Sequence, residues 1–83
     1  MDFTKGMVVI SKAGRDKGYL LAVVGVEADC IIVADGKERP LERPKRKNPK
    51  HLAKTAVTVS LENITNRGLR RALREELKRQ TGV

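Results

Sequence analysis

An 83-residue chain can form one domain, and its apolar residues, with Phe3 and Tyr19 as the two aromatics, make a core too small for a ligand-sized cavity. The formal net charge of +8 is one-sided, because residues 1–42 hold six Lys or Arg against seven Asp or Glu, and residues 43–83 hold twelve against three. This uneven charge favours binding to a polyanion over the alternative that the charge serves only solubility. The small core disfavours a buried active site.

Three short apolar runs in the first half predict β-strands over residues 7–10, 19–26 and 30–34. The polar segment 12–18 between the first two runs contains two glycines. The pair Asp35-Gly36 after the third run is a hairpin signal, since glycine accepts a positive φ. Short runs with turn signals between them predict a small antiparallel barrel or sandwich.

The middle of the chain is rich in proline and in positive charge. Residues 37–41 are expected to return as a fourth strand, which Pro40 and Pro44 place at a sheet edge or end. Residues 43–51 contain no acid, and we predict an extended conformation because their prolines exclude a helix. Apolar and polar residues then alternate over 57–61, which predicts a half-buried strand or an extended strap.

Residues 66–80 predict an amphipathic helix that starts after an N-cap at Asn63 or Thr65 and ends at Gly82. Its narrow apolar stripe is expected to dock on the barrel and consists of Leu69, Leu73 and Leu77. The opposite face is a secondary RNA-binding candidate and carries Arg67, Arg70, Arg71, Arg74 and Lys78. A membrane-surface or partner-binding helix is the alternative, which the lack of Trp and Phe in the stripe disfavours.

Few residues are suited to catalysis or metal binding. The chain has one histidine and one cysteine, and neither a phosphate-cradling glycine loop nor a dinucleotide fingerprint is present. His51 lies in the basic stretch, where contact with a partner or packing is favoured over a general-base role. We expect no enzymatic activity, no metal, no cofactor and no small-molecule substrate.

The cysteine and the hydropathy pattern indicate where the protein works. Cys30 precedes the apolar run 31–33, so we expect a small core residue with an unreactive thiol in a reducing compartment. Residues 1–20 scatter charges among apolar positions, unlike a signal peptide, and no apolar run approaches the ~20 residues of a membrane span. A soluble cytoplasmic protein with no membrane partner is expected.

Two segments carry the primary RNA-binding candidates. In the loop 12–18, flexible glycines let Lys12, Arg15 and Lys17 approach a partner, although an ordinary hairpin loop with solvated charges is the alternative. The basic stretch 43–54 contains six cations, which are Arg43, Lys45, Arg46, Lys47, Lys50 and Lys54. A solvated linker is the alternative here, but the prolines make the stretch semi-rigid, so it would lose little entropy on a phosphate ribbon.

The scarcity of aromatic residues indicates the kind of RNA. Readers of single strands stack bases on several exposed rings, and Tyr19 alone cannot form such a platform. Recognition of folded RNA by its shape, through phosphates and 2′-hydroxyls, is the better fit.

Three segments of the first half form a recognisable set, namely residues 6–9 (GMVV), 13–19 (AGRDKGY) and 22–26 (AVVGV). Together they resemble the KOW motif, a strand–loop–strand unit of ribosomal proteins and transcription elongation factors. Residues 33–36 (VADG) and 43–55 (RPKRKNPKHLAKT) extend the likeness, and they resemble large-subunit ribosomal protein fourteen of the archaeal and eukaryotic type. The resemblance covers roughly residues 3–56.

The resemblance implies an SH3-like β-barrel of about five strands that binds ribosomal RNA of the large subunit. It also implies RNA contact by the loop residues Lys12, Arg15 and Lys17 and by the strip Arg43, Lys45, Arg46, Lys47, Lys50 and His51. The expected organisation is a barrel over residues 1–62, including the basic stretch, with a basic helix over 63–81 packed on it. A KOW protein-interaction module and a nonspecific DNA-binding barrel are the alternatives, and a monomer is expected away from RNA.

Overall fold

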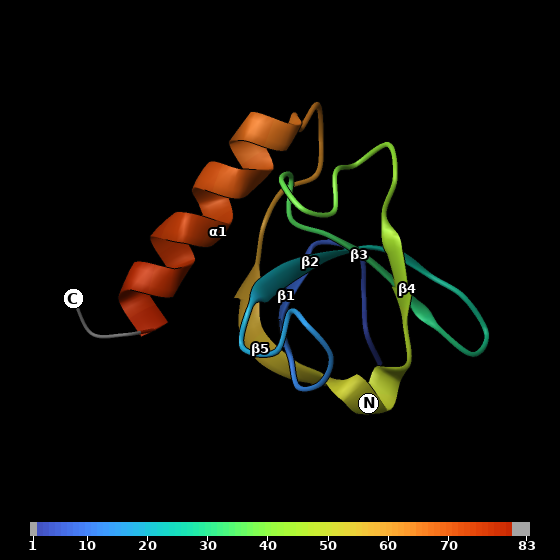
Figure 1. Ribbon diagram of the computed structural model, residues 1–83. Helices are drawn as coiled ribbons and strands as arrows, with labels where there is room; N and C mark the ends of the chain where they lie inside the picture. The colour runs from blue at the N-terminus through green and yellow to red at the C-terminus, as the bar shows by residue number, and fades with distance from the viewer. Residues whose placement is uncertain (1, 81–83) are drawn as a thin grey trace.

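The protein, described over residues 2–80 by a computed structural model, is a five-stranded antiparallel sheet with one α-helix beside it (Figure 1). The strands are β1 (Met7–Ser11), β2 (Leu20–Val26), β3 (Ile31–Ala34), β4 (Lys45–Lys47) and β5 (Leu52–Thr58). A turn of 3-10 helix, η1 (Pro49–His51), precedes β5, and the helix is α1 (Asn66–Gln80). The predicted β-rich fold with a C-terminal helix is therefore confirmed.

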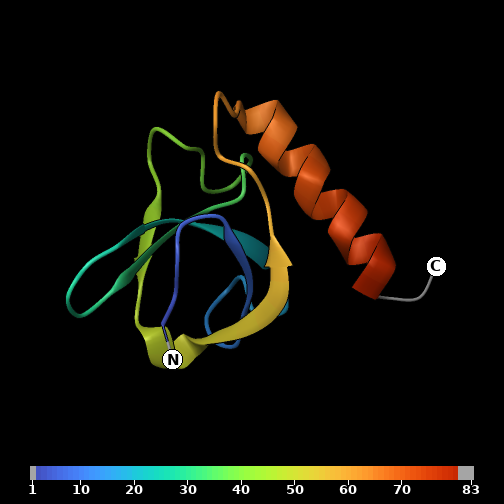
Figure 2. The same ribbon diagram turned by 180° about the vertical axis from the view of Figure 1, so that it is seen from behind.

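The sheet is open rather than closed into a barrel. Its strand order is β4-β3-β2-β1-β5, and no pairing joins the two edge strands within residues 2–80. The turn η1 connects these edges along the chain, and β5 is strongly curved (Figure 2). Register shifts between Met7 and Val9 and between Val23 and Gly25 interrupt the pairing, and such irregularities bend a strand and increase its twist.

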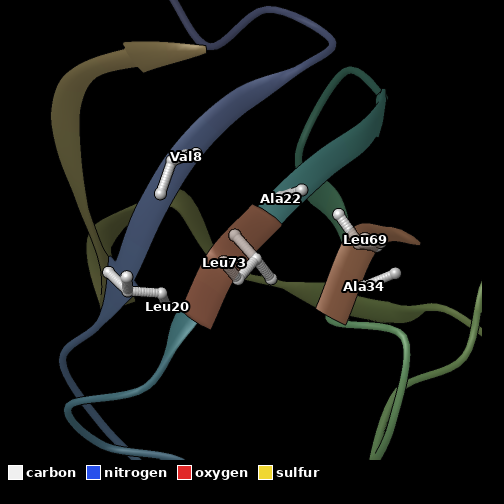
Figure 3. Packing of buried hydrophobic residues seen from close by; sticks show 6 residues of the cluster. All are labelled: Val8, Leu20, Ala22, Ala34, Leu69 and Leu73. Carbon is white, nitrogen blue, oxygen red and sulfur yellow. The ribbon is translucent and has the colours of Figure 1, made fainter. Parts of the chain in front are cut away.

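Alternation along the strands divides the core into two clusters. One cluster takes Val8, Leu20, Ala22 and Ala34 from the sheet and Leu69 and Leu73 from α1 (Figure 3). The second cluster, on the other side of the sheet, contains Val9, Leu21, Val23, Ile31, Val33 and Leu52. Because both faces are covered by apolar contacts, β1 and β2 read as nearly continuous apolar runs and not as alternating strands.

The helix has the predicted bounds over the described residues, while the predicted stop at Gly82 lies outside them. Thr65 is the N-cap, because its Oγ1 accepts a hydrogen bond from the Gly68 N–H at 3.0 Å. The predicted leucine stripe is only partly buried, since Leu77 is 48% exposed and Glu76 is buried instead. A four-residue repeat advances by about 40° at each step, so the third leucine has rotated away from the sheet.

The predicted strand over residues 37–41 is wrong. The Asp35 carboxylate accepts hydrogen bonds from the N–H groups of Lys37 and Arg39, at 2.8 and 2.9 Å, which bends the chain into a turn. The Leu41 N–H donates to Asn66 Oδ1 at 2.7 Å, so its backbone is joined to the helix rather than to the sheet. The strand that pairs with β3 is β4, which lies within the basic stretch itself.

Two further expectations need correction. Residues 43–51 are not extended throughout, because the 3-10 helix η1 occupies Pro49–His51. Pro49 does not exclude this helix, because it stands at the first position, where a backbone N–H would have no partner within the helix. The predicted strand over 57–61 is displaced toward the N-terminus, because β5 ends at Thr58 and Leu61 lies beyond it. Its pairing with β1 begins at Leu52, whose side chain fills the second cluster.

Candidate nucleic-acid interface

The loop between β1 and β2 is closed by backbone hydrogen bonds. The Gly18 N–H donates to the Ser11 carbonyl at 2.8 Å, and the Tyr19 N–H donates to the Asp16 carbonyl at 2.9 Å. Gly14 and Gly18 have φ values of +87° and +89°, in the left-handed region that favours glycine. This backbone carries three exposed cations, the predicted contacts Lys12, Arg15 and Lys17.

Lys47 is buried at the base of this loop, which corrects its predicted role as an RNA contact. Its Nζ lies 2.7 Å from Asp16 Oδ1 and 3.0 Å from Ser11 Oγ, and it donates to the Ala13 carbonyl at 3.1 Å. The side chains of Lys47 and Asp16 are only 6% and 11% exposed. Lys47 therefore fastens the loop to β4 and does not offer its charge to a partner.

The Asp16 carboxylate remains charged at neutral pH despite its burial. Burial is the largest single influence and raises the pKa of Asp16, but hydrogen bonds from Lys47 and Ser11 and the lysine charge together outweigh it. The pKa of Asp16 consequently lies below its ordinary value. Removing either charge of such a pair leaves the other buried without compensation.

Strand alternation divides the three cations of β4 between two sides of the sheet. Lys45 and Lys47 lie on the side of the second cluster, whereas Arg46 lies on the other side. The Arg46 Nε is 3.3 Å from Glu27 Oε1, and both side chains are well exposed, so this ion pair contributes little to stability. The basic stretch is thus not a one-sided strip.

The two ends of the basic stretch differ in their environment. Arg43 is exposed in the turn before β4, where its N–H donates to the Pro40 carbonyl at 2.9 Å. Lys54 on β5 is half-buried, and its Nζ lies 4.7 Å from the centre of the Phe3 ring. Lys54 therefore contributes to packing around Phe3 in addition to its charge.

The loop and η1 meet at one end of the sheet. The Lys12 N–H donates to the His51 carbonyl at 2.8 Å, and Asn48 caps η1 by accepting a hydrogen bond from the Lys50 N–H at 2.9 Å. The side chains of Lys12, Lys50 and His51 are exposed. The structure thus joins predicted contacts that are far apart in the sequence.

The predicted cations of α1 are exposed and divide between two hollows beside the helix. Arg67 and Arg71 line a hollow with Thr65 at the start of the helix. Arg70 and Arg74 line a different hollow, toward the turn that follows β3. Lys78 is exposed near the end of the helix.

Cys30 is half-buried beside the β2–β3 turn and belongs to neither core cluster, which corrects the expectation of a core residue. Its Sγ donates to Glu27 Oε1 at 3.2 Å. This hydrogen bond is the main cause that raises the pKa of the Cys30 thiol above its ordinary value. The same bond, followed by the charge of Arg46, lowers the pKa of Glu27.

Sequence reasoning missed the polar residues that hold the loop in place, namely Ser11 and Asp16. Asp16 is the one acid among the loop cations, which is the signal that could have marked it. Its partner is 31 residues away, and no local pattern connects them.

The chain matches no protein-family model and no curated protein sequence. Among residues 2–80, no group of three His, Cys, Asp or Glu side chains is placed to hold a metal ion. Within the same residues, no helix has the length and apolar composition required to cross a membrane.

Proposed function

We propose that this chain is an RNA-binding protein of the KOW type that binds folded ribosomal RNA of the large subunit, as a ribosomal or ribosome-associated protein. In this proposal it binds phosphates and groove shape and catalyses no reaction. The primary surface consists of the exposed cations of the loop and the basic stretch, which are Lys12, Arg15, Lys17, Arg43, Lys45, Arg46 and Lys50, together with His51. The arginine face of α1 extends it.

The strand order supports an SH3-like scaffold. Five antiparallel strands in the order β4-β3-β2-β1-β5, with a single 3-10 turn between the last two, have the connectivity of that fold class. We propose that the sheet is a partly open member of this class. Closure of the remaining gap is not required for binding, because the exposed cations lie on the loop, on η1, and on or next to the edge strand β4.

The observation that carries the proposal is the buried ion pair of Lys47 with Asp16. It fixes a loop with three exposed cations against the strand that carries the basic stretch. The Lys12–His51 backbone hydrogen bond makes a second connection between the same two segments. Cations held in place before binding lose less conformational entropy when they meet phosphates, so a rigid mount increases affinity for an RNA of matching shape.

The test is the salt dependence of binding to ribosomal RNA, measured by fluorescence anisotropy. Each phosphate neutralised is expected to add about −0.7 to −0.9 to the slope of log affinity against log salt. The variant Lys45→Ala/Arg46→Ala/Lys50→Ala should reduce that slope by roughly 2 to 3 units, because it removes three exposed charges. Lys47 is left in place since its loss would disturb the loop.

Lys5→Ala is the matched control for Lys50→Ala. Lys5 is also exposed, but it precedes β1 at the opposite end of that strand from the loop. We expect Lys50→Ala to make the slope of log affinity against log salt less steep, and Lys5→Ala to leave that slope unchanged. Equal effects of the two changes, or duplex DNA competing as well as ribosomal RNA at fixed salt, would contradict it.

A further inference from the structure

A groove of about 360 Å³ lies between α1, the end of the β1–β2 loop and the turn that follows β3. Its lining includes Tyr19 and Leu77, which are 52% and 48% exposed. Only one other large apolar side chain of residues 2–80, Val26, is comparably exposed. Two of the three most exposed large apolar side chains of residues 2–80 therefore line this one groove, which makes it a candidate binding site.

The walls of the groove are held together by the fold. The Asn66 side chain accepts a hydrogen bond from the Leu41 N–H and donates one to Glu42 Oε1 at 2.8 Å, which joins the turn after β3 to the start of α1. Gly36, with a φ of +82°, lies so close to the helix that an added Cβ would collide with the Asn66 carbonyl oxygen. The groove is consequently formed in advance of any ligand.

Tyr19 has an equally fixed backbone. Its N–H is bonded to the Asp16 carbonyl, and the Asp16 side chain is anchored by Lys47. The ring thus extends from a hydrogen-bonded part of the loop, and about half of its surface is exposed. An exposed aromatic ring on a fixed backbone is suited to stacking on another planar ring.

The helix wall of the groove carries only positive charge, whereas the turn wall carries both signs. Arg70 and Arg74 stand on the helix wall, and Asp35, Lys37 and Glu38 stand on the wall formed by the turn. Asp35 Oδ1 accepts two hydrogen bonds from the backbone of the turn, whereas Glu38 is the more exposed of the two acids and the more accessible acceptor for a ligand. A complementary ligand has an anionic group at one side, a flat ring in the middle and a hydrogen-bond donor at the other.

We infer that the groove binds one unstacked nucleotide of the RNA, and this inference rests on the proposed function. The base lies against Tyr19 and Leu77, the phosphates pair with Arg70 and Arg74, and Glu38 accepts a hydrogen bond from the exocyclic amino group of the base. A base that lacks this amino group, such as uracil, binds more weakly than cytosine. Recognition of folded RNA by shape is thereby supplemented by one base-reading contact.

A second hollow of about 250 Å³ continues the groove on the far side of Tyr19. It shares Tyr19, Asp35 and Glu38 with the first hollow and adds Arg15 and Arg39 to the lining. Arg15 is a predicted RNA contact of the loop, so cations flank the tyrosine on both sides. This arrangement suits a base whose neighbouring phosphates continue in two directions.

The test uses the fluorescence of Tyr19, which is the one tyrosine in a chain without tryptophan. The 83-residue chain is titrated with ribosomal RNA, with oligo(C) and oligo(U) of equal length, and with inorganic polyphosphate, which offers phosphates without bases. Stacking is expected to quench the emission with RNA and not with polyphosphate, and quenching by oligo(C) should occur at lower concentration than by oligo(U). Glu38→Ala should remove most of the difference between the two oligomers.

Tyr19→Ala should weaken RNA binding on the order of ten-fold and leave polyphosphate binding unchanged, whereas Tyr19→Phe should bind RNA nearly as well as the native chain. Because Tyr19 is half exposed, both variants are expected to keep the native circular dichroism spectrum, and Leu77→Ala offers a second, independent probe.

Two results would overturn the inference. If RNA binds with a steep salt slope but neither quenches Tyr19 nor responds to Tyr19→Ala, the nucleotide site is absent, the RNA-binding function stands, and the groove is open to a protein partner. If RNA does not bind at low salt, the proposed function fails as well.

Discussion

The basic stretch 43–54 and the helix α1 are similarly rich in positive charge, yet the fold uses that charge differently. In the basic stretch, Lys47 is buried in an ion pair, Lys54 lies over the Phe3 ring, and Arg46 is paired with Glu27. In the helix, every cation predicted to bind RNA is exposed, because Leu69, Leu73 and Glu76 occupy the side that meets the sheet. Positive charge on a short strand can therefore be structural, whereas the positive charge on this helix face stays at the surface.

The largest expected effect tests this comparison directly on β4. Lys47→Met should destabilise the fold by about 3–5 kcal/mol, because it leaves the Asp16 carboxylate buried without its partner. Lys45 lies two residues before Lys47 on the same strand, but its side chain is exposed. Lys45→Met removes the same kind of charge and should change the free energy of unfolding by less than about 0.5 kcal/mol. Urea denaturation of the three proteins measures both values.

A rescue separates loss of the charge pair from loss of packing. Asp16→Asn/Lys47→Met removes both charges, and it should recover much of the stability lost in Lys47→Met, since no uncompensated charge remains buried. If Lys47→Met and Lys45→Met are equally stable, the distinction between structural and surface cations is lost.

The next effect concerns the helix, whose buried side includes Leu69 and Leu73. Leu69→Ala should cost roughly 2–5 kcal/mol, because Leu69 is fully buried between the helix and the sheet and its truncation leaves a cavity. Leu77→Ala should cost much less, since Leu77 is half exposed. Thermal unfolding followed by circular dichroism would compare the two variants, and a large loss for Leu77→Ala would contradict the observed burial.

The smallest effect is the share of the pH dependence of the unfolding free energy that comes from Asp16. The pKa of Asp16 is lower in the folded state than in the unfolded state, so the unfolded chain binds a proton more readily as the pH falls. The stabilisation is present above the unfolded pKa of about 3.9 and is lost as the pH falls through the lower folded value. Between pH 6 and pH 2, the native protein should lose more stability than Asp16→Asn/Lys47→Met, as measured by urea denaturation at each pH.

Much of the secondary structure could be predicted because its causes are local. The helix bounds follow from Thr65 as a cap and from apolar residues at helical spacing, and both signals lie within a few residues of each other. The first three strands follow from apolar runs between turn signals in the same way. The failure at residues 37–41 also has a local cause, the Asp35 side chain, but the bond of Leu41 to Asn66 spans 25 residues.

The candidate site was less predictable because sequence shows which charges exist and not which way they point. The loop cations and the helix cations are exposed as predicted, while Lys47 is not. Alternation on β4 separates Arg46 from its neighbours, and a strand of three lysine and arginine residues gives no apolar pattern to reveal it.

Composition and short-range spacing suffice to predict the excess of positive charge, the β-rich first part and the amphipathic helix. The pairing of Lys47 with Asp16, the open sheet and the groove lined by Tyr19 and Arg70 emerge in the folded structure alone. Those outcomes depend on contacts between residues far apart in the chain, whose energy exists only once the sheet and the helix have come together.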